Sequence, residues 1–253
     1  MGNEVSTARY MAVGSFLVNF GTQTYGMLIK PNMKDIADAN HFAFSPNPWF
    51  IAAFFSGQTA LQLYWIRELF LLDDSNNTEG TTAATEAAHV AIAYAPIYAV
   101  GNLCIAGWLL FWLRQSFSLS QILVTVNTTA QLFAVARLPP LKRDSPRLLW
   151  VTHLVAKTFA GIGILDFVDN GGVAMHHRAP PSTLAQALTY SLFPIVAAAS
   201  GPIFGSTLVY DLLAMYVGQR GVAGAEAWSA RLGWTALAVG GIVGWKGLLS
   251  VRG

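Results

Sequence analysis

Long runs of apolar residues, separated by short polar connections, dominate the pattern of this chain. A helix needs about 20 mostly apolar residues to cross the hydrocarbon core of a bilayer. Runs of about this length predict seven membrane-spanning helices, at residues 8–29, 49–72, 88–113, 117–138, 148–169, 188–217 and 230–250. We therefore expect an all-α fold, a polytopic membrane helical bundle that forms a single integral membrane domain over residues 1–253.

The sixth run contains the dipeptide Gly201-Pro202. Proline lacks a backbone donor and obstructs the preceding helical turn, so a kink or a break is expected there. We favour one kinked helix over 188–217, because each half alone has only about 15 residues and is short for a crossing. Two short helices are the alternative.

The composition agrees with a membrane protein. Hydrophobic residues make up 54% of the chain and charged residues 11%, whereas an ordinary soluble domain has about 25% charged residues. The formal net charge is +2, and no Lys/Arg-rich block is present. The chain therefore lacks the electrostatic footprint of a nucleic-acid-binding protein. Its expected partners are the lipid bilayer and apolar molecules.

The connection 139–147 has the strongest cluster of basic residues and carries Lys142, Arg143 and Arg147. Positively charged connections lie preferentially in the cytoplasm. With seven spans, the amino terminus is then cytoplasmic and the carboxy terminus lies on the opposite side. We expect a multi-pass protein of the endoplasmic reticulum.

Four ionisable residues, Glu68, His153, Lys157 and Asp211, lie inside the apolar runs. A charge within the hydrocarbon layer costs roughly 2.5 kcal/mol or more, so such residues usually face a protein interior and serve a function. Odd-numbered and even-numbered spans run in opposite directions. The end of the second span, the start of the fifth and the end of the sixth therefore share one side, and the four residues are expected to converge on one cavity.

Helical spacing adds two polar residues to this candidate site. Tyr64 lies four residues before Glu68, and Thr207 lies four residues before Asp211. Residues four apart share one face of a helix. The alternative is a purely structural role, in which the four ionisable residues form ion pairs that hold the helices in register.

Asp166 and Asp169 precede Asn170-Gly171-Gly172. Glycine commonly ends a helix, so the two acids are expected to lie at the membrane interface and to cap a turn. As magnesium ligands they could instead hold a diphosphate, because hard cations bind carboxylate oxygens. Only one such pair exists, whereas a prenyltransferase needs two. The prenyltransferase pattern is therefore incomplete.

Two acidic motifs and one further segment carry a resemblance to a known family. The motifs are Trp65-Ile66-Arg67-Glu68, late in the second span, and Tyr210-Asp211, late in the sixth; the segment is residues 45–50, Ser-Pro-Asn-Pro-Trp-Phe. With these features and its size, the chain resembles the seven-span fungal membrane-bound terpene cyclases of meroterpenoid pathways, in particular the ascofuranone-type group.

The resemblance implies a membrane-embedded cyclase of secondary metabolism. Such an enzyme protonates an epoxide or alkene of a lipophilic, prenylated (farnesyl-type) substrate and closes rings without a metal or cofactor. Either Asp211 or Glu68 would then donate the proton, and the other acid would act as the base that ends the cation cascade. His153 and Lys157 would tune the pKa values of the two acids.

A small-molecule or ion transporter, or a channel, is the competing function. In that case the same buried charges form an ion or proton pathway. Transporters often contain broken helices and internal repeats. The Gly201-Pro202 break fits this pattern, but no repeat is visible in the sequence.

Overall fold

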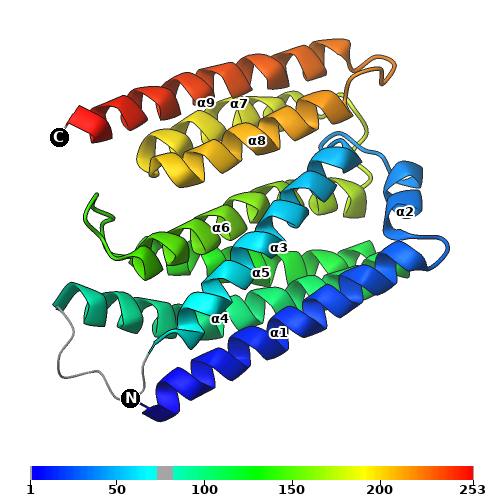
Figure 1. Ribbon diagram of the computed structural model, residues 1–253. Helices are drawn as coiled ribbons and strands as arrows, with labels where there is room; N and C mark the ends of the chain where they lie inside the picture. The colour runs from blue at the N-terminus through cyan, green and yellow to red at the C-terminus, as the bar shows by residue number, and fades with distance from the viewer. Residues whose placement is uncertain (1, 73–81, 253) are drawn as a thin grey trace.

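The computed structural model describes residues 2–72 and 82–252, and every regular element within them is an α-helix. The all-α prediction is therefore confirmed for these residues. Eight long helices alternate in direction along the chain, as Figure 1 shows. They are α1 (Gly2–Leu28), α3 (Pro48–Phe70), α4 (Thr82–Leu113), α5 (Phe117–Arg137), α6 (Arg147–Ala174), α7 (Thr183–Ala199), α8 (Pro202–Gly218) and α9 (Glu226–Arg252), with the short α2 (Met33–Ala39) between α1 and α3.

Several of these helices are compatible with a membrane protein. Within the described residues, four are both long and apolar enough to cross a bilayer, namely α4, α5, α6 and the Glu226–Leu249 part of α9. The helices α7 and α8 are apolar but have only 17 residues each. The predicted number of seven spans is not confirmed.

The sixth predicted span is two helices, so the prediction of one kinked helix over 188–217 is wrong. Ser200 and Gly201 both adopt extended backbone conformations, with ψ of 171° and 164°, and the chain reverses there. Figure 1 shows α7 and α8 as neighbouring antiparallel helices beside α9. Lys246 of α9 donates hydrogen bonds to the carbonyl oxygens of Ala198 and Ser200, which satisfies the end of α7. The reversal also brings both chain termini to the same end of the bundle (Figure 1).

Helix α3 lies antiparallel along α6. Near the end of α3, Trp65 Nε1 donates to Thr152 Oγ1 at 3.0 Å. Farther back along α3, Gln58 Oε1 accepts from Thr158 Oγ1 at 2.8 Å. The start of α3 therefore lies beside the end of α6, and the end of α3 beside the start of α6.

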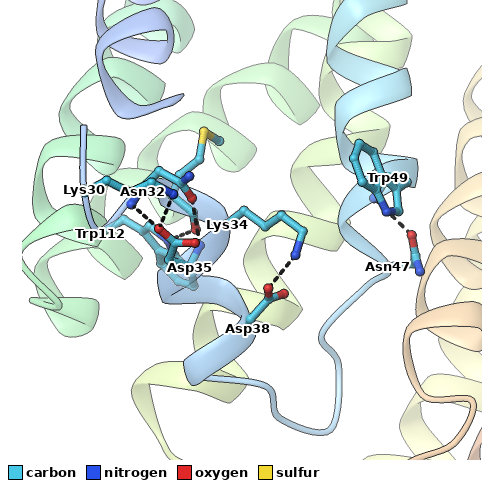
Figure 2. Close-up of polar contacts among 9 residues, drawn as sticks. Lys30, Asn32, Lys34, Asp35, Asp38, Asn47, Trp49 and Trp112 are labelled. Carbon is cyan, nitrogen blue, oxygen red and sulfur yellow. Dashed lines mark hydrogen bonds and ion pairs between the residues drawn. The ribbon is translucent and has the colours of Figure 1, made fainter. Parts of the chain in front are cut away.

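The segment that joins α1 to α3 is fixed by helix caps and one anchoring contact (Figure 2). At the start of α2, the Asn32 side chain accepts from the backbone N–H of Asp35, and the Asp35 carboxylate accepts from the backbone N–H of Asn32. Trp112 Nε1 of α4 donates to a main-chain carbonyl at the beginning of α2, at 3.3 Å. At the start of α3, Asn47 Oδ1 accepts from the backbone N–H of Trp49 at 3.0 Å. Because caps satisfy otherwise free N–H groups, both helices begin at defined residues.

Candidate functional site

Helix α8 packs along α6 in the same direction. In the first half of α8, Thr207 lies so close to Gly161 that a Cβ on this glycine would be 2.5 Å from the threonine side chain. Just after α8, Gln219 Nε2 donates to the main-chain oxygen of Ser45 at 3.0 Å. The Ser45 hydroxyl in turn donates to the carboxylate of Asp169, near the end of α6, at 2.8 Å. The carboxyl ends of α6 and α8 therefore lie together.

Because α6 and α8 run in the same direction, the four ionisable residues do not lie around one cavity. The prediction that they would is therefore wrong. Asp211, just past the middle of α8, lies toward the carboxyl end of α6. Glu68 instead lies against Arg147, the first residue of α6, and His153 follows less than two turns later. The reason is the full reversal at Gly201, which turns α8 around relative to a single continuous helix. Whether any of these residues is catalytic stays a prediction.

Asp211 is the most unusual polar residue of the bundle. Its side chain is completely buried, with 0% exposure, and neither carboxyl oxygen has a hydrogen-bond partner. The carboxyl group of Asp166 and the hydroxyl group of Tyr210 lie close enough to interact with it electrostatically. A lone buried carboxylate costs far more free energy than a neutral acid, so this environment accommodates the protonated form.

Tyr210, the residue before Asp211, contacts aromatic side chains of α3. The Tyr210 hydroxyl donates to the main-chain oxygen of Phe50 at 2.7 Å. Its ring centroid lies 5.4 Å from that of Phe50 and 5.7 Å from that of Phe54. Rings at these separations make favourable tilted contacts. The beginning of α3 thus packs two aromatic rings on Tyr210, the residue that precedes the buried acid.

Asp166 and Asp169 are half-buried near the end of α6, on the same side as Asp211. The expectation that the helix ends at the glycine pair and that the two acids cap a turn is wrong, since α6 continues through both glycines to Ala174. Sequence reasoning missed Asp166 as a neighbour of Asp211. The Gly201-Pro202 dipeptide could have indicated this neighbour. If the chain reverses there, Asp211 lies on the same side as Asp166.

Glu68 has a different role from Asp211. It is 6% exposed and accepts from Arg67 Nη1 at 2.8 Å and from Arg147 Nε at 3.0 Å. Tyr64, expected to share its site, is 38% exposed, and the Arg67 guanidinium lies over its ring at 6.0 Å. The ion pair with Arg147 therefore joins α3 to α6, which is the structural alternative considered for Glu68.

We expect Glu68→Gln to lower the stability of the protein by about 1 kcal/mol, because both arginines lose an ionised partner but remain largely solvated. The measurement is the thermal unfolding temperature in detergent. Glu86→Gln is the matched control, since Glu86 is exposed on α4. Equal unfolding temperatures for the Glu68 variant and the wild type would contradict the structural role.

His153 and Lys157 lie one turn apart on α6, toward its amino end. His153 is 1% exposed, and neither ring nitrogen has a hydrogen-bond partner. Lys157 is half-buried and lies next to Gly201, at the reversal between α7 and α8. The structure therefore brings these two residues together but separates them from Asp211.

Two further features bear on ligand binding. Within the described residues, no three His, Cys, Asp or Glu side chains are grouped so that they could hold a metal ion. A hollow of about 330 Å³ lies between the turn that joins α4 to α5 and the end of α6, and its lining includes His176 but no carboxylate. It does not involve Asp211, Glu68, His153 or Lys157.

No known family, curated protein or solved structure matches this chain.

Proposed function

We propose that this chain is an integral membrane terpene cyclase, in which Asp211 protonates a prenylated, farnesyl-type substrate. The observation that carries the proposal is the fully buried carboxyl group of Asp211, which has no hydrogen-bond partner and lies close to the hydroxyl group of Tyr210. Stable folds rarely leave a buried polar group unsatisfied, and the exceptions often serve chemistry. The resemblance of the Tyr210-Asp211 motif to the fungal cyclases supports the same function.

The proposed reaction uses two acids in opposite roles. Asp211 gives its proton to the terminal epoxide oxygen or alkene carbon of the substrate, which leaves a carbocation that the chain's own double bonds attack to close rings. The aromatic faces of Phe50, Phe54 and Tyr210 stabilise the cation, because ring faces attract positive charge. The Asp166 carboxylate accepts the proton lost at the end of the cascade. Proton return from Asp166 to Asp211 restores the enzyme, and the product is an isomer of the substrate.

Asp166 replaces Glu68 as the proposed base, since Glu68 is held by two arginines at the other end of α6. Tyr64, His153 and Lys157 likewise take no part in the proposed proton transfers. Thr207 packs between Asp211 and the reversal, where it fixes the spacing of α6 and α8.

We also propose that all eight long helices lie in the membrane, with α7 and α8 as a helical hairpin. Each of these two helices has 17 residues and is about 25 Å long, slightly shorter than the hydrocarbon core. The basic connection 139–147 would lie in the cytoplasm, and the amino and carboxy termini would lie at that same end of the bundle. An endoplasmic reticulum location remains part of this proposal.

The test is to incubate membranes that contain the protein with an epoxyfarnesyl phenol. We expect a product of unchanged mass that has lost the epoxide and gained rings, as measured by chromatography and mass spectrometry. Membranes from cells without the protein are the control. Unreacted substrate under conditions where the protein is folded would argue against cyclase activity.

The break between α7 and α8 favours one competing function, a proton-coupled or ion transporter. Broken helices at membrane depth are common in transporters, where their ends bind substrates and ions. In this case Asp211 and Asp166 would relay protons. Solute or proton flux into proteoliposomes, together with no cyclised product, would support transport over cyclisation.

A further inference from the structure

Lys157 is a cation without a partner inside a long apolar helix. It lies ten residues after Arg147, so its Cα is about 15 Å from the start of α6. In the part of the chain that the structure describes, its ammonium group makes no hydrogen bond or ion pair and remains half-buried. Ionisable residues at membrane depth normally face a partner or a ligand. The position of the Lys157 ammonium group therefore calls for a partner that the described residues do not supply.

His153 adds a second unsatisfied group on the same helix face. It precedes Lys157 by four residues, and the two side chains lie close enough to interact electrostatically. The Pro139 carbonyl lies near the imidazole, in a geometry that falls short of a full hydrogen bond to either ring nitrogen. With 1% exposure, the imidazole is also shielded from solvent. A buried donor without an acceptor costs about 1–3 kcal/mol, which a bound acceptor would recover.

The amino end of α8 lies against Lys157. A Cβ on Gly201 would be 3.7 Å from Lys157 Nζ. Gly201 is the N-cap residue of α8, and no side chain caps this helix end. The first backbone N–H groups of a helix attract anions, because they are unpaired and carry the positive end of the helix dipole. Lys246 donates to the neighbouring carboxyl end of α7. Because lysine has no acceptor atom, it cannot satisfy the N–H groups at the start of α8.

The acidic side chains at this end of α6 are either paired or exposed. Glu68, the buried acid at this end of α6, is already bound by Arg67 and Arg147. The connection between α5 and α6 carries the exposed Lys142 and the exposed Asp144. The Lys157 ammonium group thus lies beside the amino end of α8 and close to the imidazole of His153, and within the described residues it has no carboxylate partner.

We propose that Lys157, His153 and the amino end of α8 bind the phosphate group of a lipophilic molecule. Phosphate is an acceptor of several hydrogen bonds, and it suits helix ends and lysine ammonium groups alike. The hydrocarbon tail would occupy the bilayer or the bundle interior. This site lies ten residues from Asp211 along α8, about 15 Å away, so it stands independently of the proposed cyclase chemistry.

The test is equilibrium binding of radiolabelled dodecyl phosphate to the purified protein in an uncharged detergent. We expect saturable binding that unlabelled dodecanol does not displace. Excess inorganic phosphate separates the two possible sources of the anion: weak displacement indicates a lipid phosphate, whereas strong displacement indicates a free phosphate site. Either result supports the phosphate site, and equal displacement by dodecanol and dodecyl phosphate would overturn it.

Lys157→Gln is expected to weaken the binding of dodecyl phosphate by about tenfold or more, as charge-assisted hydrogen bonds contribute this much. Lys157→Arg keeps the charge and is expected to retain most of the affinity. Lys142→Gln removes the same charge from the exposed connection and serves as the matched control. If Lys157→Gln binds dodecyl phosphate as tightly as the wild type and the Lys142→Gln control do, the assignment is wrong. It is also wrong if Lys157→Arg is the only variant that loses affinity.

Discussion

Replacing Asp211 with asparagine is expected to lower cyclisation of the farnesyl-type substrate by about 100-fold or more, the usual contribution of a positioned general acid. The amide has nearly the same shape as the acid but cannot release a proton. Because the Asp211 carboxyl group has no hydrogen-bond partner, the substitution breaks no hydrogen bond. The unfolding temperature should therefore stay at or above the wild-type value, while product formation is lost.

Two controls separate this effect from a general loss of charge. Asp144→Asn removes an exposed carboxylate from the connection between α5 and α6 and should leave the activity unchanged. Glu68→Gln should lose stability but retain product formation, the opposite pattern to Asp211→Asn. A fully active Asp211→Asn protein would remove Asp211 from the mechanism, and a correctly folded but inactive Glu68→Gln protein would return Glu68 to it.

Gly218→Ala is expected to cause the largest loss of stability, about 3 kcal/mol, the upper part of the usual range for overpacking. A Cβ at Gly218 would lie 2.4 Å from the main-chain oxygen of Ser45, 2.6 Å from the carbonyl carbon of Pro46 and 2.7 Å from the nitrogen of Asn47. These are backbone atoms of the segment before α3 and cannot rotate away as a flexible side chain would. The end of α8 must therefore shift away from the start of α3.

The same shift would disturb the candidate site, because the segment before α3 also holds the hydrogen bond from Ser45 to Asp169. Thermal unfolding in detergent measures the loss. Gly57→Ala in α3 is the control, since a Cβ there meets no atom within 4 Å. It should change stability by only about 1 kcal/mol or less, in the stabilising direction, because alanine favours helix over glycine. Similar unfolding temperatures for the two variants would contradict the close contact.

The sequence predicted most helices closely where apolar runs end in strong local signals. The run 117–138 corresponds to α5, which spans Phe117–Arg137. The run 148–169 stops short of α6, which continues to Ala174. Glycines there indicated a helix end, yet a Cβ on Gly172 would lie 3.2 Å from the ring of Phe44. This glycine makes room for a neighbouring segment rather than ending the helix, a distinction that depends on long-range packing.

The sequence identified residues of the candidate site but not how they are arranged. The cost of burying charge identified Asp211, Glu68, His153 and Lys157 as unusual. It could not show that Glu68 is bound by two arginines, one of them from another helix. It also could not show that Asp166 faces the same region as Asp211. Those relations depend on which helices pack together.

The apolar pattern by itself determined that this chain is helical and compatible with a membrane, because runs of apolar residues must be buried and must satisfy their backbone groups internally. The tertiary structure alone decided the direction of α8. A kink and a full reversal have the same local signal at Gly201-Pro202. Long-range contacts stabilise the reversal: Lys246 binds the end of α7, Thr207 packs on Gly161, and Gly205 lies against Val243 of α9. This one turn of the chain decides which buried acids are neighbours.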